Sequence, residues 1–169
     1  MNKLLIEKYK PKTIEEFFLD SINIKLLKNY INTNHYNYIF EGESGCGKST
    51  LINLLISNYF NENYNAMKDN ICYVTLLKDQ GINFYKNDLK IFINNCSSNK
   101  LKKFIIIEDI ELFSDLIQTY FLDLIKNHKH NINFILSTSN ISKINNNFSH
   151  ILDTIKFNFI NNSFLLNII

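Results

Sequence analysis

The stretch GESGCGKS at residues 42–49 constrains the fold more than any other part of the sequence. It matches the pattern G-x-x-x-x-G-K-[ST] at every fixed position, and it holds three of the four glycines in the chain. An apolar run at residues 36–40 precedes it, and apolar residues at helical spacing follow it. Glycines in such a strand–loop–helix unit let backbone N–H groups turn inward around phosphate oxygens. The sequence therefore predicts a phosphate-binding loop.

Short apolar runs alternate with segments of helical period along the rest of the chain. Strands rich in branched and aromatic residues are predicted at 36–40, 71–77, 103–109, 132–138 and 154–159. Helices are predicted after the phosphate loop, over 82–96, and from Ser114, as the N-cap, to His128. Asn-rich pieces at 58–65 and 142–149 are predicted loops. This alternation predicts an α/β fold, with a mainly parallel five-stranded sheet between layers of helices.

Length and composition favour one soluble globular domain spanning residues 1–169. The chain has 169 residues, of which 46% are hydrophobic and 20% are charged, and it has no internal repeat or linker. Its net charge of +2 is too small to indicate nucleic-acid binding by itself. The charged start is not a signal peptide, and no apolar run approaches the roughly 20 residues that a membrane-spanning helix needs. We expect no membrane partner.

The cysteines indicate a reducing compartment. Cys46, Cys72 and Cys96 are widely spaced, odd in number and without metal-ligand spacing. Reduced thiols in the cytoplasm or the nucleus are therefore expected. The sequence His128-Lys129-His130 also lacks the spacing of a metal site, and we interpret it as solvated surface.

The predicted loop carries the chemistry of nucleotide binding. Lys48 is expected to reach the β- and γ-phosphates of ATP, and the Ser49 hydroxyl to ligate Mg²⁺. The alternative, a tight strand–helix turn without a ligand, is disfavoured by the complete motif. Cys46 is expected to contribute its backbone N–H rather than its thiol. The predicted cofactor-binding residues of the loop are Gly42, Glu43, Ser44, Gly45, Cys46, Gly47, Lys48, Ser49 and Thr50.

Hydrolysis would need further groups beside the phosphates. Glu108 and Asp109 follow the apolar residues 105–107, so Glu108 is predicted to hold Mg²⁺ with Ser49, and Asp109 to orient a water molecule. The alternative is a solvated strand end with ordinary charges. Thr138, Ser139 and Asn140 end the next strand, and Ser139 is the candidate that senses the γ-phosphate. Hydroxyl residues at strand ends also form ordinary turns.

Five motifs, in order, resemble those of the small subunits of clamp loaders, the replication factor C type of AAA+ protein. They are EKYKPKTIEEFF (7–18), with the only proline, LKDQGINFYKNDLKIF (77–92), FIIIEDIELF (104–113), NFILSTSNISKI (133–144) and FSHILDTIKFNF (148–159). Gln118 also falls where the family carries a glutamine. The resemblance implies a three-layer αβα P-loop NTPase fold that binds ATP and Mg²⁺ and acts in DNA replication.

The resemblance also implies site residues and partners. Tyr9 and Pro11 would lie beside the adenine. Lys86 and Lys90 take positions that contact primer–template DNA in the family, although a solvated helix face explains these two lysines equally well. Other clamp-loader subunits and a sliding clamp are the remaining implied partners.

The sequence departs from the family in its catalytic residues. The acidic pair is reversed, so that Asp109, one methylene shorter, stands where the family has the glutamate that activates water. His150 replaces the arginine that the family inserts into a neighbouring ATP site. Leu122 and Asp123 replace its paired arginines. The chain also ends after the last strand, so the helical lid and the collar are expected to be absent. Weak or lost hydrolysis is therefore expected.

Three alternative functions remain. The first is an ATP-bound assembly module of a replication complex that does not hydrolyse ATP. The second is a small-molecule or nucleotide kinase, which is disfavoured because the chain contains no arginine to build a phosphate-clamping lid. The third is an initiator or helicase-loader AAA+ protein, which the opening motif disfavours.

Overall fold

Five parallel strands form one sheet in the order β2-β3-β4-β1-β5, as the computed structural model shows. The strands are β1 (Tyr38–Glu41), β2 (Ile71–Val74), β3 (Lys103–Ile107), β4 (Ile132–Thr138) and β5 (Asp153–Lys156). The structure describes residues 9–76, 82–95 and 101–158. The prediction of a mainly parallel five-stranded sheet is confirmed. Some predicted features lie outside the described residues. They are Cys96, the first residues of the opening motif, and the last residue of each of the strands predicted at 71–77 and 154–159.

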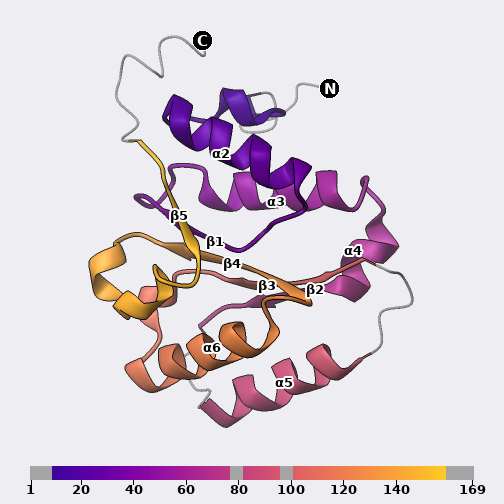
Figure 1. Cartoon of the computed structure of the whole chain (residues 1–169), viewed down its shortest axis with the longest axis vertical. Helices are drawn as coiled ribbons and strands as arrows, with labels where there is room; N and C mark the ends of the chain where they lie inside the picture. Colours follow the sequence, from indigo (N-terminus) through magenta and orange to yellow (C-terminus); the bar gives the residue numbers. More distant parts are fainter. Residues whose placement is uncertain (1–8, 77–81, 96–100, 159–169) are drawn as a thin grey trace.

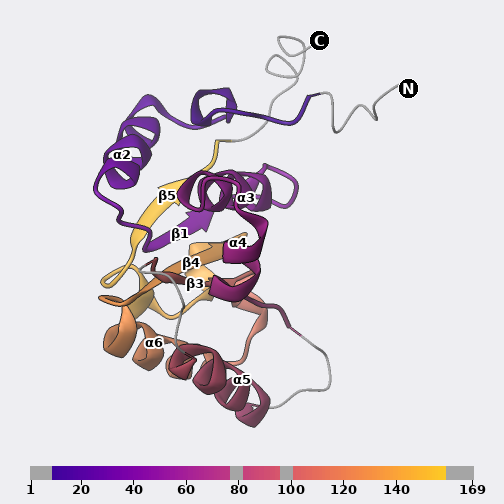
Figure 2. The ribbon, with the colours of Figure 1, turned by 90° about the vertical axis from the view of Figure 1, so that its right-hand side faces the viewer.

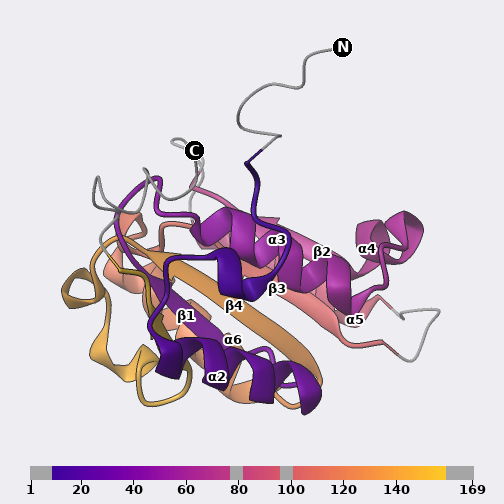
Figure 3. The same cartoon turned by 90° about the horizontal axis from the view of Figure 1, so that it is seen from above.

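Helices cover both faces of this sheet, which gives three layers (Figures 1 and 2). The α-helices are α2 (Ser21–Asn32), α3 (Lys48–Tyr59), α4 (Tyr64–Asn70), α5 (Ile82–Asn94) and α6 (Asp115–His128). Short 3₁₀ turns are η1 (Ile14–Glu16), η2 (Ile110–Leu112), η3 (Ile141–Lys143) and η4 (Asn146–Phe148). Helices α2 and α3 lie over one face, as the view from above shows, and α5 and α6 lie over the other (Figures 1 and 3).

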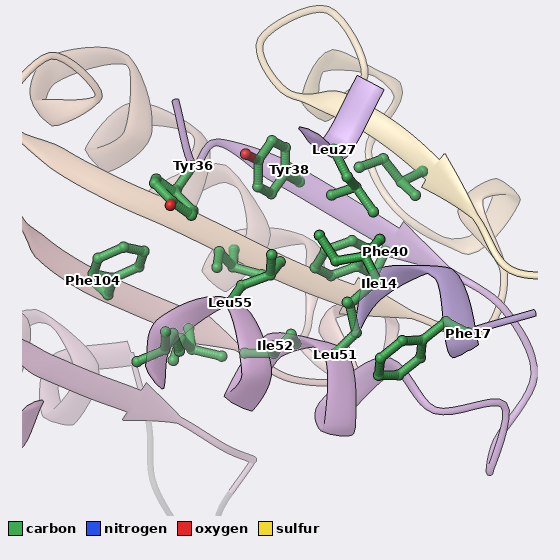
Figure 4. Packing of buried hydrophobic residues seen from close by; sticks show 14 of the residues in the cluster. Ile14, Phe17, Leu27, Tyr36, Tyr38, Phe40, Leu51, Ile52, Leu55 and Phe104 are labelled. Carbon is green, nitrogen blue, oxygen red and sulfur yellow. The ribbon is translucent and has the colours of Figure 1, made fainter. Parts of the chain in front are cut away.

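Each face of the sheet has its own hydrophobic core. Phe104 and Ile106 of β3 point to the core that α3 covers, whereas Ile105 and Ile107 point to the core that α5 and α6 cover. Figure 4 shows the first core, in which Leu51, Ile52 and Leu55 of α3 pack against the sheet. Each fully buried side chain of this size stabilises the fold by about 1.5–3 kcal/mol. The two cores fix α3, and with it the loop that precedes α3, against the sheet.

Two local predictions need correction, and one helix was missed. Residues 58–65 are not one loop, because α3 continues to Tyr59 and α4 begins at Tyr64. The Asn63 side chain accepts a 3.1 Å hydrogen bond from the backbone N–H of Ala66 and so caps α4. Ser114 occupies the N-cap position of α6, but its side chain makes no capping hydrogen bond. Helix α2 was not predicted.

The segment before α2 closes one edge of the sheet. Leu19 pairs with Phe157 in an antiparallel bridge, and the backbone N–H of Asn158 donates to the carbonyl of Phe18 at 3.1 Å. The Asn158 side chain donates to Asp20 Oδ1 at 2.9 Å. These contacts hold the segment before α2 against the residues that follow β5, and Phe17 of this segment lies next to Gly47 of the phosphate loop. No helix within the described ranges is both long and apolar enough to cross a membrane.

Candidate nucleotide-binding site

The predicted phosphate loop joins β1 to α3, which begins at Lys48. The backbone N–H of Gly42 donates to the carbonyl of Thr138 at 3.1 Å, which ties the start of the loop to β4. A Cβ atom at Gly42 would lie 2.8 Å from both Cys46 Sγ and Phe157 Cβ. Gly47 has a φ of +103°, in the left-handed region that favours glycine. The loop therefore needs glycine at both positions.

Lys48 points back over the loop rather than into solvent. Its ammonium donates to the carbonyls of Gly42 at 2.6 Å and Glu43 at 2.9 Å, and the residue is only 8% exposed. The two hydrogen bonds hold a positive charge against the loop backbone, beside the start of α3. A helix N-terminus and a lysine in this arrangement attract phosphate.

Ser49 and Glu108 meet across the site. The Ser49 hydroxyl donates to Glu108 Oε1 at 2.9 Å. Glu108 follows β3, and its backbone N–H donates to the carbonyl of Val74 at 3.2 Å, which fixes the residue between β2 and β3. Hydroxyl and carboxylate oxygens are ligands that Mg²⁺ accepts. The two predicted metal ligands thus lie together.

This pair alone does not complete a metal site. Among the described residues, no group of three or more His, Cys, Asp or Glu side chains is placed to bind a metal ion. Mg²⁺ in nucleotide sites is typically held by one or two protein oxygens together with phosphate oxygens and water. The donor set therefore fits a cation that arrives with a nucleotide.

Asp109 lies next to this pair in an unusual backbone conformation. Its φ of 48° and ψ of 52° are left-handed, and its backbone N–H donates to Ser137 Oγ at 3.1 Å. Partial burial raises the pKa of the Asp109 carboxyl, and the nearby charge of Glu111 raises it further, while Lys48 opposes the shift. A pocket of about 230 Å³ is lined by Ser44, Gly45, Gly47, Lys48, Ser49, Thr50, Glu108, Asp109 and Ser137.

Ser139 borders a second pocket, which shares Ser44 and Gly45 with the first. This pocket, of about 500 Å³, is lined by Glu41, Gly42, Glu43, Ser44, Gly45, Cys46, Ser139, Lys156, Phe157 and Asn158. Glu41 pairs there with Lys156, at 3.1 Å between Oε2 and Nζ. Cys46 is buried within the loop, and burial raises the pKa of its thiol. A thiol held in the neutral form is a poor nucleophile.

Sequence reasoning missed two residues of the site. Glu111 accepts hydrogen bonds from the Ser139 backbone N–H at 2.8 Å and from the Ser139 hydroxyl at 2.5 Å. Ser137 lines the pocket that holds the acidic pair and accepts the N–H of Asp109. Both lie beside predicted site residues: Glu111 is the third acid of the run EDIE, and Ser137 lies two residues before Ser139, within the strand that precedes it.

The residues predicted to lie beside adenine are not drawn into these pockets. Tyr9 is 39% exposed, Pro11 is half-buried, and neither lines the two pockets that border the loop. The aromatic residue that the same segment brings to the loop is Phe17, whose ring would lie 3.5 Å from a Cβ atom at Gly47. The role of Tyr9 and Pro11 stays a prediction.

Gln118 connects the acidic segment to the turn that follows β4. Its side-chain N–H groups donate to the carbonyls of Phe113 at 2.9 Å and Ile110 at 3.4 Å, and its Oε1 accepts from the backbone N–H of Asn145 at 2.9 Å. The residue is only 2% exposed. The buried amide of Gln118 thus connects three segments around the site: α6, which carries it, the segment from Ile110 to Phe113, and the turn at Asn145.

The remaining predicted residues lie apart from the loop. Lys86 and Lys90 line a groove of about 550 Å³ between α5 and α6, and the Lys86 ammonium lies 5.6 Å from the centre of the Tyr120 ring. These helices cover the face of the sheet opposite α3 (Figure 1). His150 is exposed between η4 and β5, Leu122 is buried, and Asp123 is exposed.

Known sequences match most of this structure. The family profile described as RNA helicase matches residues 38–141, from β1 through β4. The replication factor C small subunit of Picrophilus torridus is 27% identical over 146 residues, which are 85% of this chain and 45% of that protein. The one from Archaeoglobus fulgidus is 24% identical over 144 residues, 84% of this chain and 44% of that protein. The chain thus spans about half the length of these relatives.

Solved structures share the arrangement of the layers. A RuvB variant from Thermotoga maritima superposes with a TM-score of 0.64 at 16% identity, over 95% of this chain and 52% of that one. A DNA polymerase III gamma subunit-related protein from the same organism superposes with a TM-score of 0.61 at 15% identity, over 83% of this chain and 47% of that one. At this identity the likeness concerns the fold alone.

Proposed function

Because this chain belongs to the RNA helicase family and is similar over most of its length to replication factor C small subunits, we propose that it is an ATP-binding, clamp-loader-like subunit. It would take part in DNA replication by helping to load a sliding clamp onto primed DNA. Its fold is the P-loop AAA+ fold, with the parallel sheet order β2-β3-β4-β1-β5. Other subunits of the loader, the clamp and primer–template DNA are its proposed partners.

The observation that carries nucleotide binding is the position of three side chains around the loop. Lys48 is held over the loop by two of its carbonyls, and Ser49 contacts Glu108 from the neighbouring strand at 2.9 Å. The loop is shaped by Gly42 and Gly47, at positions where a side chain would clash or strain the backbone. A strand–helix turn that binds no ligand would need neither the buried lysine nor the serine–carboxylate pair, so finding both supports nucleotide binding.

ATP and Mg²⁺ are the proposed ligands of this site. The loop residues 42–50 would hold the phosphates, with Lys48 neutralising their charge, and Ser49 and Glu108 would hold the metal ion. When bound, Mg²⁺ supplies positive charge to the β- and γ-phosphate oxygens. Asp109 lines the same pocket, where its carboxylate can hold a water molecule.

We propose that hydrolysis is slow in this chain. An aspartate stands at the position of the water-activating residue, and its side chain is one methylene shorter than that of the glutamate expected there, so its carboxylate reaches less far towards the phosphates. His150 lacks the forked charge of an arginine finger, which is worth about 10³–10⁵ in rate. A non-hydrolysing, ATP-bound assembly module is the alternative that these two residues favour.

Equilibrium binding of ATP with Mg²⁺, measured by isothermal titration calorimetry, tests the proposal. Wild type should bind with 1:1 stoichiometry, and Lys48→Ala should weaken binding by about 10- to 100-fold because a charged hydrogen-bond donor is lost. Lys68→Ala, which removes an exposed lysine of α4, is the matched control and should bind as wild type does. A wild type that binds no nucleotide would overturn the proposal.

Turnover separates the two forms of the proposal. ATP hydrolysis should be measured for the chain alone, with primed DNA, and with primed DNA and a sliding clamp. Hydrolysis that the DNA and clamp stimulate supports a working loader subunit. Stoichiometric ATP binding without turnover in all three conditions supports the passive assembly module.

A further inference from the structure

Both hydrogen-bond donors of Ser139 go to one carboxylate oxygen. Glu111 Oε1 accepts the Ser139 backbone N–H at 2.8 Å and the Ser139 hydroxyl at 2.5 Å. A serine hydroxyl has one proton and two lone pairs. While this proton is donated to Glu111, Ser139 has only lone pairs to offer to any other group.

The carboxylate that takes this proton is charged and enclosed. Burial alone would raise the pKa of Glu111, but hydrogen bonds, chiefly those from the hydroxyl and the N–H of Ser139, outweigh it, so the pKa lies below its ordinary value. The other oxygen, Oε2, is buried and meets no hydrogen-bond partner in the part of the chain that the structure describes. A short hydrogen bond to an ionised acceptor is stronger than a neutral one. Glu111 therefore holds the Ser139 proton firmly.

Ser139 is nevertheless placed at the phosphate loop. It lines the 500 Å³ pocket together with Gly42, Glu43 and Ser44, the first residues of the loop. It also follows Thr138, whose carbonyl accepts the N–H of Gly42. A nucleotide on the loop would bring negative phosphate oxygens close to a hydroxyl whose proton points elsewhere.

We propose that Glu111 is a positioning residue that withholds the Ser139 hydroxyl proton from the terminal phosphate of a bound nucleotide, so that the site distinguishes ATP from ADP only weakly. This inference rests on the proposed ATP binding and assigns Glu111 a role that acts through Ser139. Releasing Ser139 from Glu111 would allow its hydroxyl to donate to the γ-phosphate, an interaction that ADP cannot make. The effect is specific to the triphosphate.

The experiment measures the Kd values of ATP and ADP with Mg²⁺ by calorimetry. Glu111→Ala should raise the preference for ATP over ADP by about 10-fold, the effect of one new hydrogen bond to a charged oxygen. Glu111→Gln keeps a weaker, neutral acceptor for Ser139 and should give a smaller increase. Asp115→Ala removes an exposed acid four residues away and should leave the preference unchanged.

A double variant separates the hydroxyl from the charge. If the increase requires the Ser139 proton, it must disappear when Glu111→Ala is combined with Ser139→Ala. An increase that survives in the double variant would overturn the inference, because loss of negative charge near the phosphates would then explain it. No increase in either single variant of Glu111 would also overturn it.

Nuclear magnetic resonance tests the pairing without nucleotide. The chemical shift of the Ser139 amide proton should change with pH as Glu111 titrates, below the usual range of a glutamate. This transition should be missing in Glu111→Gln. Both samples carry Asp109→Asn, so that the neighbouring carboxylate does not contribute a transition of its own. A Ser139 amide that does not titrate overturns the inference. Failure of wild type to bind either nucleotide overturns the proposed function, whereas binding with an unchanged preference overturns only the role of Glu111.

Discussion

The backbone N–H of Asp109 donates a 3.1 Å hydrogen bond to the hydroxyl oxygen of Ser137, and this contact holds Asp109 in a left-handed conformation with a φ of 48°. Asp and Asn tolerate this region better than other residues with a side chain. The register that pairs Ile107 with Leu136 sets Glu108 and Asp109 beside Ser137. The order Glu-Asp thus puts the shorter acid where the backbone is left-handed.

Asp109→Glu is expected to raise ATP turnover and to lower stability. The longer side chain carries its carboxylate about one methylene further towards the phosphates. The left-handed backbone disfavours glutamate, so the free energy of unfolding should fall by about 0.5–1 kcal/mol. Steady-state hydrolysis and urea denaturation measure the two effects on the same protein.

Asp109→Asn is the control for this variant. It suits the left-handed backbone and removes the charge, so its stability should not fall, while any turnover should be lost. If Asp109→Glu hydrolyses ATP no faster than wild type, the reach of the carboxylate does not limit the reaction.

The strand–loop–helix geometry around residues 42–49 could be predicted because its information is local. The shape of the loop depends on glycines within eight residues of sequence and on the strand and helix on either side. The pairing of Glu111 with Ser139 could not be predicted, since it depends on the register of β3 against β4 and on the turn η2 between them. These two residues are 28 apart in sequence.

In the fold, too, features set by neighbouring residues could be predicted, whereas features set by contacts between distant segments could not. Strand β4 has the predicted bounds, Ile132–Thr138, because a run of buried apolar residues ends in polar ones. Strand β1 begins at Tyr38 rather than at residue 36, and the Asn37 side chain accepts the backbone N–H of Phe134 at 3.0 Å, a contact between distant segments. Helix α2 was not predicted, although its apolar residues do recur at helical spacing.

Lys103→Met is expected to destabilise the fold. The buried ammonium of Lys103 donates to the carbonyls of Phe92 at 2.6 Å and of Asn95, at the C-terminal end of α5. Methionine keeps the apolar stem but leaves these carbonyls without their donor. The free energy of unfolding should fall by about 1.5–3 kcal/mol, the contribution of hydrogen bonds to a charged donor. Chemical denaturation monitored by circular dichroism gives this value.

Lys126→Met provides the comparison, since Lys126 is exposed on α6 and its loss should change stability by less than about 0.5 kcal/mol. Equal stability of the two variants would show that the Lys103 hydrogen bonds contribute nothing net.

Stability should depend on pH through Glu111. Its pKa is lowered in the folded protein because the donors of Ser139 outweigh burial. The stabilisation is therefore fully present above the ordinary pKa of glutamate and is lost as the pH falls through the lowered, folded value. Glu111→Gln should reduce stability at neutral pH, and the difference should shrink on acidification.

This comparison is best made in an Asp109→Asn background. The pKa of Asp109 is raised, partly by Glu111, so its ionisation acts in the opposite direction and would otherwise offset the effect. Denaturation at a series of pH values for the two chains measures the difference. A difference that is constant with pH would mean that the charge of Glu111 is not what stabilises the pairing.

Binding of primed DNA should depend on Lys86 and Lys90. They lie one helical turn apart on α5 and line one groove with Tyr120, on the face of the sheet opposite α3. Lysine contacts to phosphate are independent of base sequence and release bound cations. Replacing both by Ala should weaken binding and reduce the slope of log K against log salt by about 2, since each lost phosphate contact contributes about 0.9.

Fluorescence anisotropy with labelled primed DNA at several salt concentrations measures this slope. Lys25→Ala combined with Lys68→Ala removes the same charge from α2 and α4, in the opposite layer, so its slope should equal that of wild type. If both double variants lose affinity equally, net charge rather than the groove determines binding. An RNA duplex of the same length should be tested in parallel, because the matching family is described as RNA helicase; stronger binding to RNA than to primed DNA would contradict the proposed partner.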